Sequence, residues 1–233
     1  MKLKADLHTH SSEDAKDVIL YDAYQLIDRA AGLGFDVLAV TNHNTVTYNQ
    51  DLAHHAQKRN ILMIPGIEAT LSRKHVIILN PDFDDSRLPA QLEDLSRIKH
   101  ENSLIMAPHP YFPQSCALKN KFWEYASYFD AMEYSHFYHS AWNYNHKAEA
   151  AAEITGLPLI GSSDCHFLWE MGTTYSWVDA DKNIPSVIQA LKAGKVTLVT
   201  SPLSSADMGR SLLHILKMRA LMGLRELKRK FSG

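Results

Sequence analysis

The sequence has few of the features that would assign a protein to a specialised setting. Its 233 residues include only two cysteines, Cys116 and Cys165, so a disulfide framework is excluded and a reducing compartment is expected. No run approaches the roughly 18 apolar residues of a membrane span. The opening Met-Lys-Leu-Lys-Ala-Asp is followed by no apolar segment of the signal-peptide kind. We therefore expect a cytoplasmic location and no membrane span.

Neither sign of charge dominates, because the formal net charge is −2. The overall charge thus favours no particular partner. A hydrophobic content of 45% and a charged content of 21% are typical of globular proteins and exclude disordered and collagen-like chains. A chain of this length suits one larger domain, since α/β barrels reach it without dividing.

Histidine stands out against this ordinary composition. There are 13 histidines and no histidine-rich tract, and histidine is both the commonest metal ligand and a general acid or base. His8 and His10 flank Thr9 on an extended segment, where alternate side chains point to the same face. The pair can therefore converge on one metal ion, although such a short motif alone is weak evidence.

Strand and helix patterns alternate along the chain. Strands are expected at 3–7, 35–41, 61–65, 75–80, 103–107, 130–134, 157–161 and 195–200, and helices at 21–33, 46–59, 89–101, 143–155 and 185–193. This alternation predicts a parallel sheet, and its seven or eight repeats favour a closed or distorted barrel.

Metal-ligand residues gather where these strands end. They are His8, His10, His43, Glu68, His109, Asp164 and His166. In parallel barrels the loops after the strands form the active face, so a site at the C-terminal ends of the strands is predicted. His75 departs from this pattern because it begins a strand.

The set resembles the PHP (polymerase and histidinol phosphatase) superfamily of metal-dependent phosphoesterases. The resemblance rests on five motifs in order: Asp6-Leu-His-Thr-His10 with Asp14, Thr41-Asn-His43, Gly66-Ile-Glu68 with His75, Pro108-His109-Pro110, and Ser163-Asp-Cys-His166. It spans residues 5–200 and implies an α/β fold, a distorted (β/α)7 TIM-like barrel with up to three metal ions at its mouth.

The resemblance also implies how the ligands are shared. His8, His10, Glu68 and Asp164 would hold one ion, and Glu68 would bridge to a second held by His75 and His109. Asp14, His43 and His166 would hold the third. Asp17 is the alternative to Asp14. Asn42 stands where the family usually has aspartate, and because an amide accepts a hydrogen bond without adding charge, the tuning of the third metal is expected to differ.

Nitrogen and carboxylate ligands without thiolates suit Zn, Mn or Fe, so we expect two to three such ions. Such a centre would hydrolyse a phosphomonoester, a nucleotide or an oligonucleotide end by attack of a metal-bridging hydroxide. Glu68 and Asp164 are the expected catalytic residues, and His136, which follows a strand, is the expected donor to the leaving group. No other cofactor is expected, and Cys165 is interpreted as a core residue.

The last 30 residues differ in charge from the rest. Residues 204–233 carry seven Lys or Arg against two acidic residues, a net charge of +5, with leucines at helical spacing. We expect a barrel domain at 1–203 and a basic amphipathic helix at 204–233, either packed on the barrel with a solvated basic face or binding nucleic acid. The sequence does not predict the oligomeric state.

Two other functions remain open. An amidohydrolase-type barrel also begins with His-x-His, but that resemblance would call for a bridging lysine where this sequence has Glu68. A metal-binding regulatory module without turnover is the third alternative, and the complete ligand set argues against it.

Overall fold

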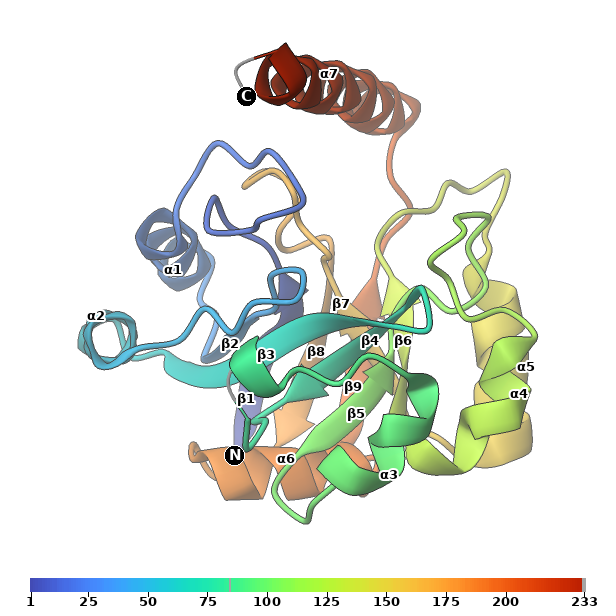
Figure 1. Ribbon diagram of the computed structural model, residues 1–233. Coiled ribbons are helices and arrows are strands. Elements are labelled where there is room, and N and C mark those ends of the chain that lie inside the picture. The colour runs from blue at the N-terminus through green and yellow to red at the C-terminus, as the bar shows by residue number, and fades with distance from the viewer. Residues whose placement is uncertain (84, 232–233) are drawn as a thin grey trace.

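The computed structural model describes residues 1–83 and 85–231, with the side chains of the last helix described through Lys217 and at Ala220. Strands and helices alternate through most of the chain (Figure 1). The strands are β1 (Lys2–Thr9), β2 (Val37–Val40), β3 (Leu62–Leu71), β4 (Lys74–Leu79), β5 (Leu104–Ala107), β6 (Ala131–Ser135), β7 (Leu159–Ser162), β8 (Thr174–Asp179) and β9 (Val196–Thr200).

The helices lie outside the sheet. They are α1 (Ala23–Gly32), α2 (Gln50–Lys58), α3 (Leu95–Ile98), α4 (Lys121–Tyr125), α5 (Asn145–Thr155), α6 (Ile184–Lys192) and α7 (Ser205–Phe231), with 3-10 turns η1 (Asp85–Arg87), η2 (Leu92–Asp94) and η3 (Ala126–Tyr128). Side-chain caps fix several starts, since Asp22, Asn49 and Asn183 each accept a backbone N–H of the first turn that follows.

One sheet holds all nine strands, in the order β7-β6-β5-β4-β3-β2-β1-β8-β9. The pairs β1–β2, β2–β3, β5–β6 and β6–β7 are parallel, whereas β4 runs antiparallel to both of its neighbours. The sheet curls into a nearly closed barrel, so the predicted α/β barrel is confirmed. Leu7, Ala39, Ile64 and Ile77 are among the fully buried residues of its apolar core.

The direction of β4 explains the unusual position of His75. Strand β3 extends to Leu71, well beyond the predicted end at residue 65, and turns back through Ser72 and Arg73 into β4. Both turn residues have positive φ, 46° and 66°, as a two-residue type I′ hairpin requires. Because β4 runs backwards, its first residues lie at the same edge as the ends of the parallel strands.

The barrel closes beside β1. After β7, the backbone N–H of Asp164 donates to the carbonyl of His8 at 2.9 Å, and the N–H of His10 donates to that of Cys165 at 3.3 Å. Farther down, the Ser176 hydroxyl of β8 accepts from the N–H of Gly161 at 2.9 Å. A Cβ at Gly161 would lie 2.8 Å from the Tyr175 carbonyl oxygen, so this close approach requires glycine.

Helix α4 was not predicted, and two further segments differ from the sequence prediction. Strand β8 was not expected, because its polar and apolar residues are exchanged relative to a typical strand. Thr174 and Ser176 point inward and are buried, whereas Tyr175 and Trp177 on the other face are partly exposed. The helix expected over 89–101 is reduced to η2 and α3.

Helix α7 lies on the side of the molecule opposite the N-terminus, across from the end of the barrel where β1 begins (Figure 1). In the first half of α7, Met208 and Ser211 are buried. Leu212, Leu213 and Leu216 are exposed, so these leucines do not form the face of the helix that packs on the barrel. The basic side chains from Arg219 onward lie outside the described residues. The division at residue 203 therefore stays a prediction.

The structure also bears on the membrane prediction. None of the helices in the described ranges combines the length and apolar character needed to cross a membrane.

Candidate metal centre

Four predicted ligands face one point at the mouth of the barrel. His8 Nε2 and His10 Nε2 are 3.1 Å apart, and each is 3.1 Å from Asp164 Oδ1. Glu68 Oε2 lies 3.6 Å from His8 Nε2 and 3.4 Å from His10 Nε2. Ligand atoms of a tetrahedral site with bonds of about 2.1 Å lie about 3.4 Å apart. Five edges of such a tetrahedron are thus present, and this donor set fits a metal ion.

Glu68 faces a second group with its other oxygen. Its Oε1 lies 2.7 Å from His75 Nδ1 and 3.2 Å from His109 Nε2. The carboxylate is almost fully buried, at 1% exposure, between the two groups of histidines. One oxygen for each group is the arrangement that a bridging ligand needs.

A third group lies on the other side of His10. His43 places Nε2 at 2.9 Å from Glu68 Oε2 and Nδ1 at 2.8 Å from Asp14 Oδ2. Asp17 Oδ2 lies 3.1 Å from His166 Nε2 and 3.5 Å from His43 Nδ1. All nine predicted ligands, together with the alternative Asp17, therefore lie at one mouth.

The two carboxylates of this third group, Asp14 and Asp17, differ in their contacts. Asp14 Oδ2 also lies 3.1 Å from His10 Nδ1 and accepts the backbone N–H of His43 at 2.8 Å. It therefore holds the rings of His10 and His43 in place. Asp17 is partly exposed and faces His166, so it has the freer oxygen of the two.

The electrostatic balance of the site is set by these contacts. Burial alone would raise the pKa of Glu68, but the positive charges of His43, His75 and His8 hold that pKa well below its usual range. Burial would lower the pKa of His43, yet Glu68 and Asp14 raise it to about 11. Metal binding to such a set displaces protons, so it strengthens as the pH rises.

The sequence reasoning missed Glu133 of β6. Its Oε1 lies 2.7 Å from His8 Nδ1, and its Oε2 accepts the backbone N–H of His109 at 2.7 Å. The residue is fully buried. A carboxylate that holds one ring nitrogen of histidine leaves the other free for a metal and fixes the ring orientation. The only signal in the sequence was an acidic residue inside an otherwise uncharged strand, Ala-Met-Glu-Tyr-Ser.

The side-chain hydrogen bonds of Asn42 go to Ser11 and Thr47 and not to a histidine. Its Oδ1 accepts the N–H of Ser11 at 2.9 Å, and its Nδ2 donates to Ser11 Oγ at 2.8 Å and Thr47 Oγ1 at 2.7 Å. The amide thus ties the loop after β1 to the loop after β2. Cys165 is buried in the apolar core, as interpreted from the sequence.

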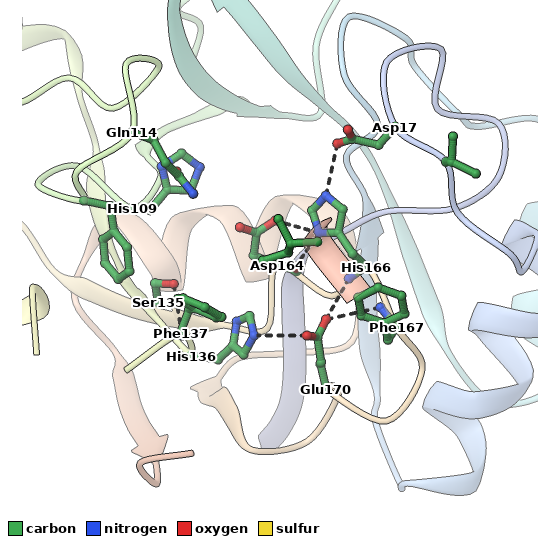
Figure 2. Close-up of a pocket in the computed structure, with 13 residues that line it drawn as sticks. Asp17, His109, Gln114, Ser135, His136, Phe137, Asp164, His166, Phe167 and Glu170 are labelled. Atoms are coloured by element: carbon green, nitrogen blue, oxygen red, sulfur yellow. Dashed lines mark hydrogen bonds and ion pairs between the residues drawn. The ribbon is translucent and has the colours of Figure 1, made fainter. Parts of the chain in front are cut away.

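His136 lies in a pocket beside the metal-ligand groups, which Figure 2 shows. The pocket has a volume of about 220 Å³. It is lined by Asp17, Val18, His109, Phe112, Gln114, Ser135, His136, Phe137, Asp164, His166, Phe167, Glu170 and Ile215. Burial lowers the pKa of His136, so its ring is neutral at pH 7.

His146, His139 and Lys74 do not line this pocket. The side chain of His146 is exposed and pairs with Glu149. His139 contacts the hydroxyl of Ser205. Lys74 donates to the carbonyls of Ser115 and Ala117.

Comparison with known proteins concerns the family and the fold. Residues 142–196 match the family model PHP_C, described as PHP-associated. A curated relative, an uncharacterized protein of Methanocaldococcus jannaschii, is 25% identical over 132 residues, which cover 52% of this chain and 76% of the relative.

Solved structures share the fold. A two-domain protein from Bacteroides vulgatus, described as containing a predicted PHP-like metal-dependent phosphoesterase, superposes with a TM-score of 0.68 at 18% identity, covering 92% of this chain and 70% of that one. The comparisons confirm the resemblance to the PHP superfamily. This PHP-like chain is also similar to a lesion-specific endonuclease Q from Pyrococcus furiosus, with a TM-score of 0.60 at 16% identity.

That endonuclease is the longer protein. The match covers 85% of the PHP-like chain and 58% of the endonuclease. A further structure holds endonuclease Q with a 27-mer duplex that carries an abasic lesion at the active site. At this level of identity the likeness concerns the fold.

Proposed function

We propose that this PHP-like chain is a metal-dependent phosphoesterase that hydrolyses a phosphomonoester, including that of a nucleotide. The observation that carries the proposal is the shared carboxylate of Glu68. One of its oxygens faces His8 and His10, which also face Asp164, and the other faces His75 and His109.

The ligand proposal follows the three groups. The first ion would be held by His8, His10, Glu68 and Asp164, the second by Glu68, His75 and His109, and the third by His43, His166 and an aspartate. For that aspartate we now favour Asp17, because its oxygen faces both histidines while Asp14 is engaged with His10 and His43.

Two to three ions of Zn, Mn or Fe suit this nitrogen and carboxylate set. Divalent ions in such a mouth supply an activated water and stabilise negative charge at phosphorus. The residues of the chain do the rest. Glu68 holds two groups of ligands at a fixed separation, Glu133 and Asp14 orient histidine rings, and His136 lies where it can hydrogen-bond to a leaving group.

Two substrate sizes fit the proposed chemistry. A small phosphorylated molecule fits within a pocket of about 220 Å³, whereas the base and sugar of a nucleotide would extend beyond it. A nucleic acid end is the larger candidate, and the similarity to endonuclease Q, which binds a lesion-containing duplex, supports keeping it in the test.

The alternatives make different predictions at Glu68. An amidohydrolase-type site would use a bridging lysine, and a carboxylate occupies that place here. A metal-binding module without turnover would keep its ions and hydrolyse nothing.

The deciding experiment measures metal content and hydrolysis on the same preparation. Elemental analysis should find two to three equivalents of Zn, Mn or Fe per chain. Phosphate release should be measured with phosphomonoesters, nucleotides and 5′-phosphorylated oligonucleotides, with amide substrates as a parallel panel. Metal-dependent phosphate release supports the proposal. Hydrolysis of amides alone, or none at full metal occupancy, would overturn it.

A further inference from the structure

Two kinds of side chain line the pocket beside the metal-ligand groups. Asp17, His109, Asp164 and His166 belong to the proposed metal centre. Aromatic and aliphatic side chains form much of the remaining lining, namely Val18, Phe112, Phe137, Phe167 and Ile215. A phosphate held at the metal centre would place its ester substituent among these apolar side chains.

His136 is a polar residue of the same lining. Its side chain is 5% exposed, and neither ring nitrogen has a hydrogen-bond partner within the part of the chain that the structure describes. The nearest acidic oxygen, Glu170 Oε1, is 4.0 Å from His136 Nε2, beyond hydrogen-bond distance. Figure 2 shows the ring among the pocket residues, between Phe137 and Glu170. A buried polar group without a partner costs free energy, which a bound ligand can recover.

Helix α7 contributes to the wall of this pocket. Ile215 lines it directly. The helix is fixed there by Ser211, whose hydroxyl donates to Glu170 Oε1 at 2.9 Å, and by His214, whose ring centre is 4.5 Å from that of Phe167. Glu170 in turn accepts the backbone N–H groups of His166 and Phe167, so α7 is joined to the loop that carries a proposed ligand.

The size of the pocket limits what it can hold. About 220 Å³ is below the roughly 300–1,000 Å³ of pockets that enclose drug-sized ligands. Aromatic walls favour a flat ring that can pack edge-to-face or offset against them. A group of about one ring is the size that fits.

We propose that this pocket receives the leaving group of a small aryl-type phosphomonoester, that His136 hydrogen-bonds to that group, and that Ile215 of α7 limits its size. This inference rests on the proposed function. In the reaction, water adds to phosphorus while the ester P–O bond breaks, and the released alcohol oxygen keeps the bonding pair and gains a proton that the water gives up.

The test compares three esters of increasing size: methyl, phenyl and 1-naphthyl phosphate. Metal-loaded wild-type protein should give the highest kcat/KM with phenyl phosphate and a value about tenfold lower with 1-naphthyl phosphate. Ile215→Ala should narrow the gap between the two aryl esters about fivefold, and Ile215→Trp should widen it. Leu213→Ala, on the exposed side of the same helix, is the matched control and should leave the ratio unchanged.

His136 is tested by hydrogen bonding at constant shape. His136→Leu should lower kcat about tenfold for methyl phosphate and less for phenyl phosphate, because the alkoxide is the poorer leaving group, and His136→Gln should restore part of the loss. Circular dichroism and metal content confirm that each variant is folded and loaded.

A binding measurement separates this inference from the proposed function. Calorimetry with phenylphosphonate and methylphosphonate, which are not hydrolysed, should show tighter binding of the phenyl compound, and Ile215→Trp should reduce the preference without removing it. If the metal-loaded protein hydrolyses the esters but neither Ile215 variant changes the kcat/KM ratio between phenyl and 1-naphthyl phosphate, the pocket assignment alone is wrong. If the metal-loaded protein hydrolyses none of the esters but still binds phenylphosphonate more tightly than methylphosphonate, the phosphoesterase proposal alone is wrong.

Discussion

The metal-ligand cluster and the pocket beside it are both buried but differ in how their polar groups are satisfied. In the cluster, charged groups face one another, and Glu68 alone lies within 3.6 Å of ring nitrogens of five histidines. In the pocket, His136 has no hydrogen-bond partner among the described residues. The cluster offers charged groups that could hold ions in fixed positions, whereas the pocket keeps a histidine whose ring nitrogens make no hydrogen bond to the described part of the chain.

The two regions also differ in origin along the chain. The cluster comes from strand ends and the loops just after them, which the fold brings to one edge. The pocket is assembled from loops and from Ile215 of α7, at the far end of the chain. Substitutions in the cluster should therefore lower kcat/KM equally for all substrates. Substitutions in the pocket should lower kcat/KM for some substrates more than for others.

Removing the metal should have the largest effect. Treatment with a chelator should reduce phosphate release to background and lower the melting temperature by about 5–10 °C, because an ion at about 100 times its Kd stabilises a fold by about 2.7 kcal/mol. Phosphate assays and calorimetry before and after re-addition of Mn²⁺ or Zn²⁺ check this. A metal-free preparation with full activity would contradict the entire cluster assignment.

Glu68→Gln should lower kcat/KM by about a thousandfold for every ester, more than the roughly 100-fold that loss of an orienting residue costs. Glutamine keeps the shape but replaces one oxygen by an amide nitrogen, which cannot bind a cation. Metal content should fall as well. Glu124→Gln, at an exposed carboxylate, is the matched control. Equal losses in both variants would show that the effect is not specific to the site.

Glu133→Gln should weaken metal affinity by about 10–100-fold, because the carboxylate that orients His8 is lost while the volume is kept. Titration of the metal-free protein with Zn²⁺ or Mn²⁺ measures the change. The ratio of kcat/KM between phenyl and methyl phosphate should stay constant, since the pocket is untouched. An unchanged affinity would show that the contact with His8 does not matter for metal binding.

Ser211→Ala should have the smallest effect, and this effect should concern the pocket and not the metal-ligand cluster. The loss of one hydrogen bond to Glu170 should lower the free energy of unfolding by about 1 kcal/mol, or about 2–4 °C in melting temperature. Metal affinity should not change. A large drop in metal affinity would mean that α7 supports the cluster as well as the pocket.

The sequence predicted the cluster because its ligands obey one rule. Parallel strands end at the same edge, so His10, His43, His109 and Asp164 could be placed together without knowledge of distances. His75 could not be placed by that rule, because β4 is antiparallel. Asp14 and Asp17 could not be separated, since the choice depends on the conformation of one short loop.

What the sequence could not predict depends on contacts between distant segments. Glu133 looked like an ordinary polar residue of an alternating strand until its oxygens were seen to face His8 and His109. Strand β8 was hidden because Thr174 and Ser176 occupy the interior positions. No local pattern joins Phe112, His136 and Ile215, so the pocket had no signature in the sequence.

The seam between β1 and the segment after β7 imposes an order of events on protein synthesis. His8 and His10 leave the ribosome first, but Asp164, which pairs with the His8 carbonyl and completes their ligand set, is made more than 150 residues later. A nascent chain therefore cannot assemble the complete first ligand set until β7 has been added. Acquisition of the proposed metal ion would follow closure of the barrel, and the loaded ion would then join the early and late parts of the chain.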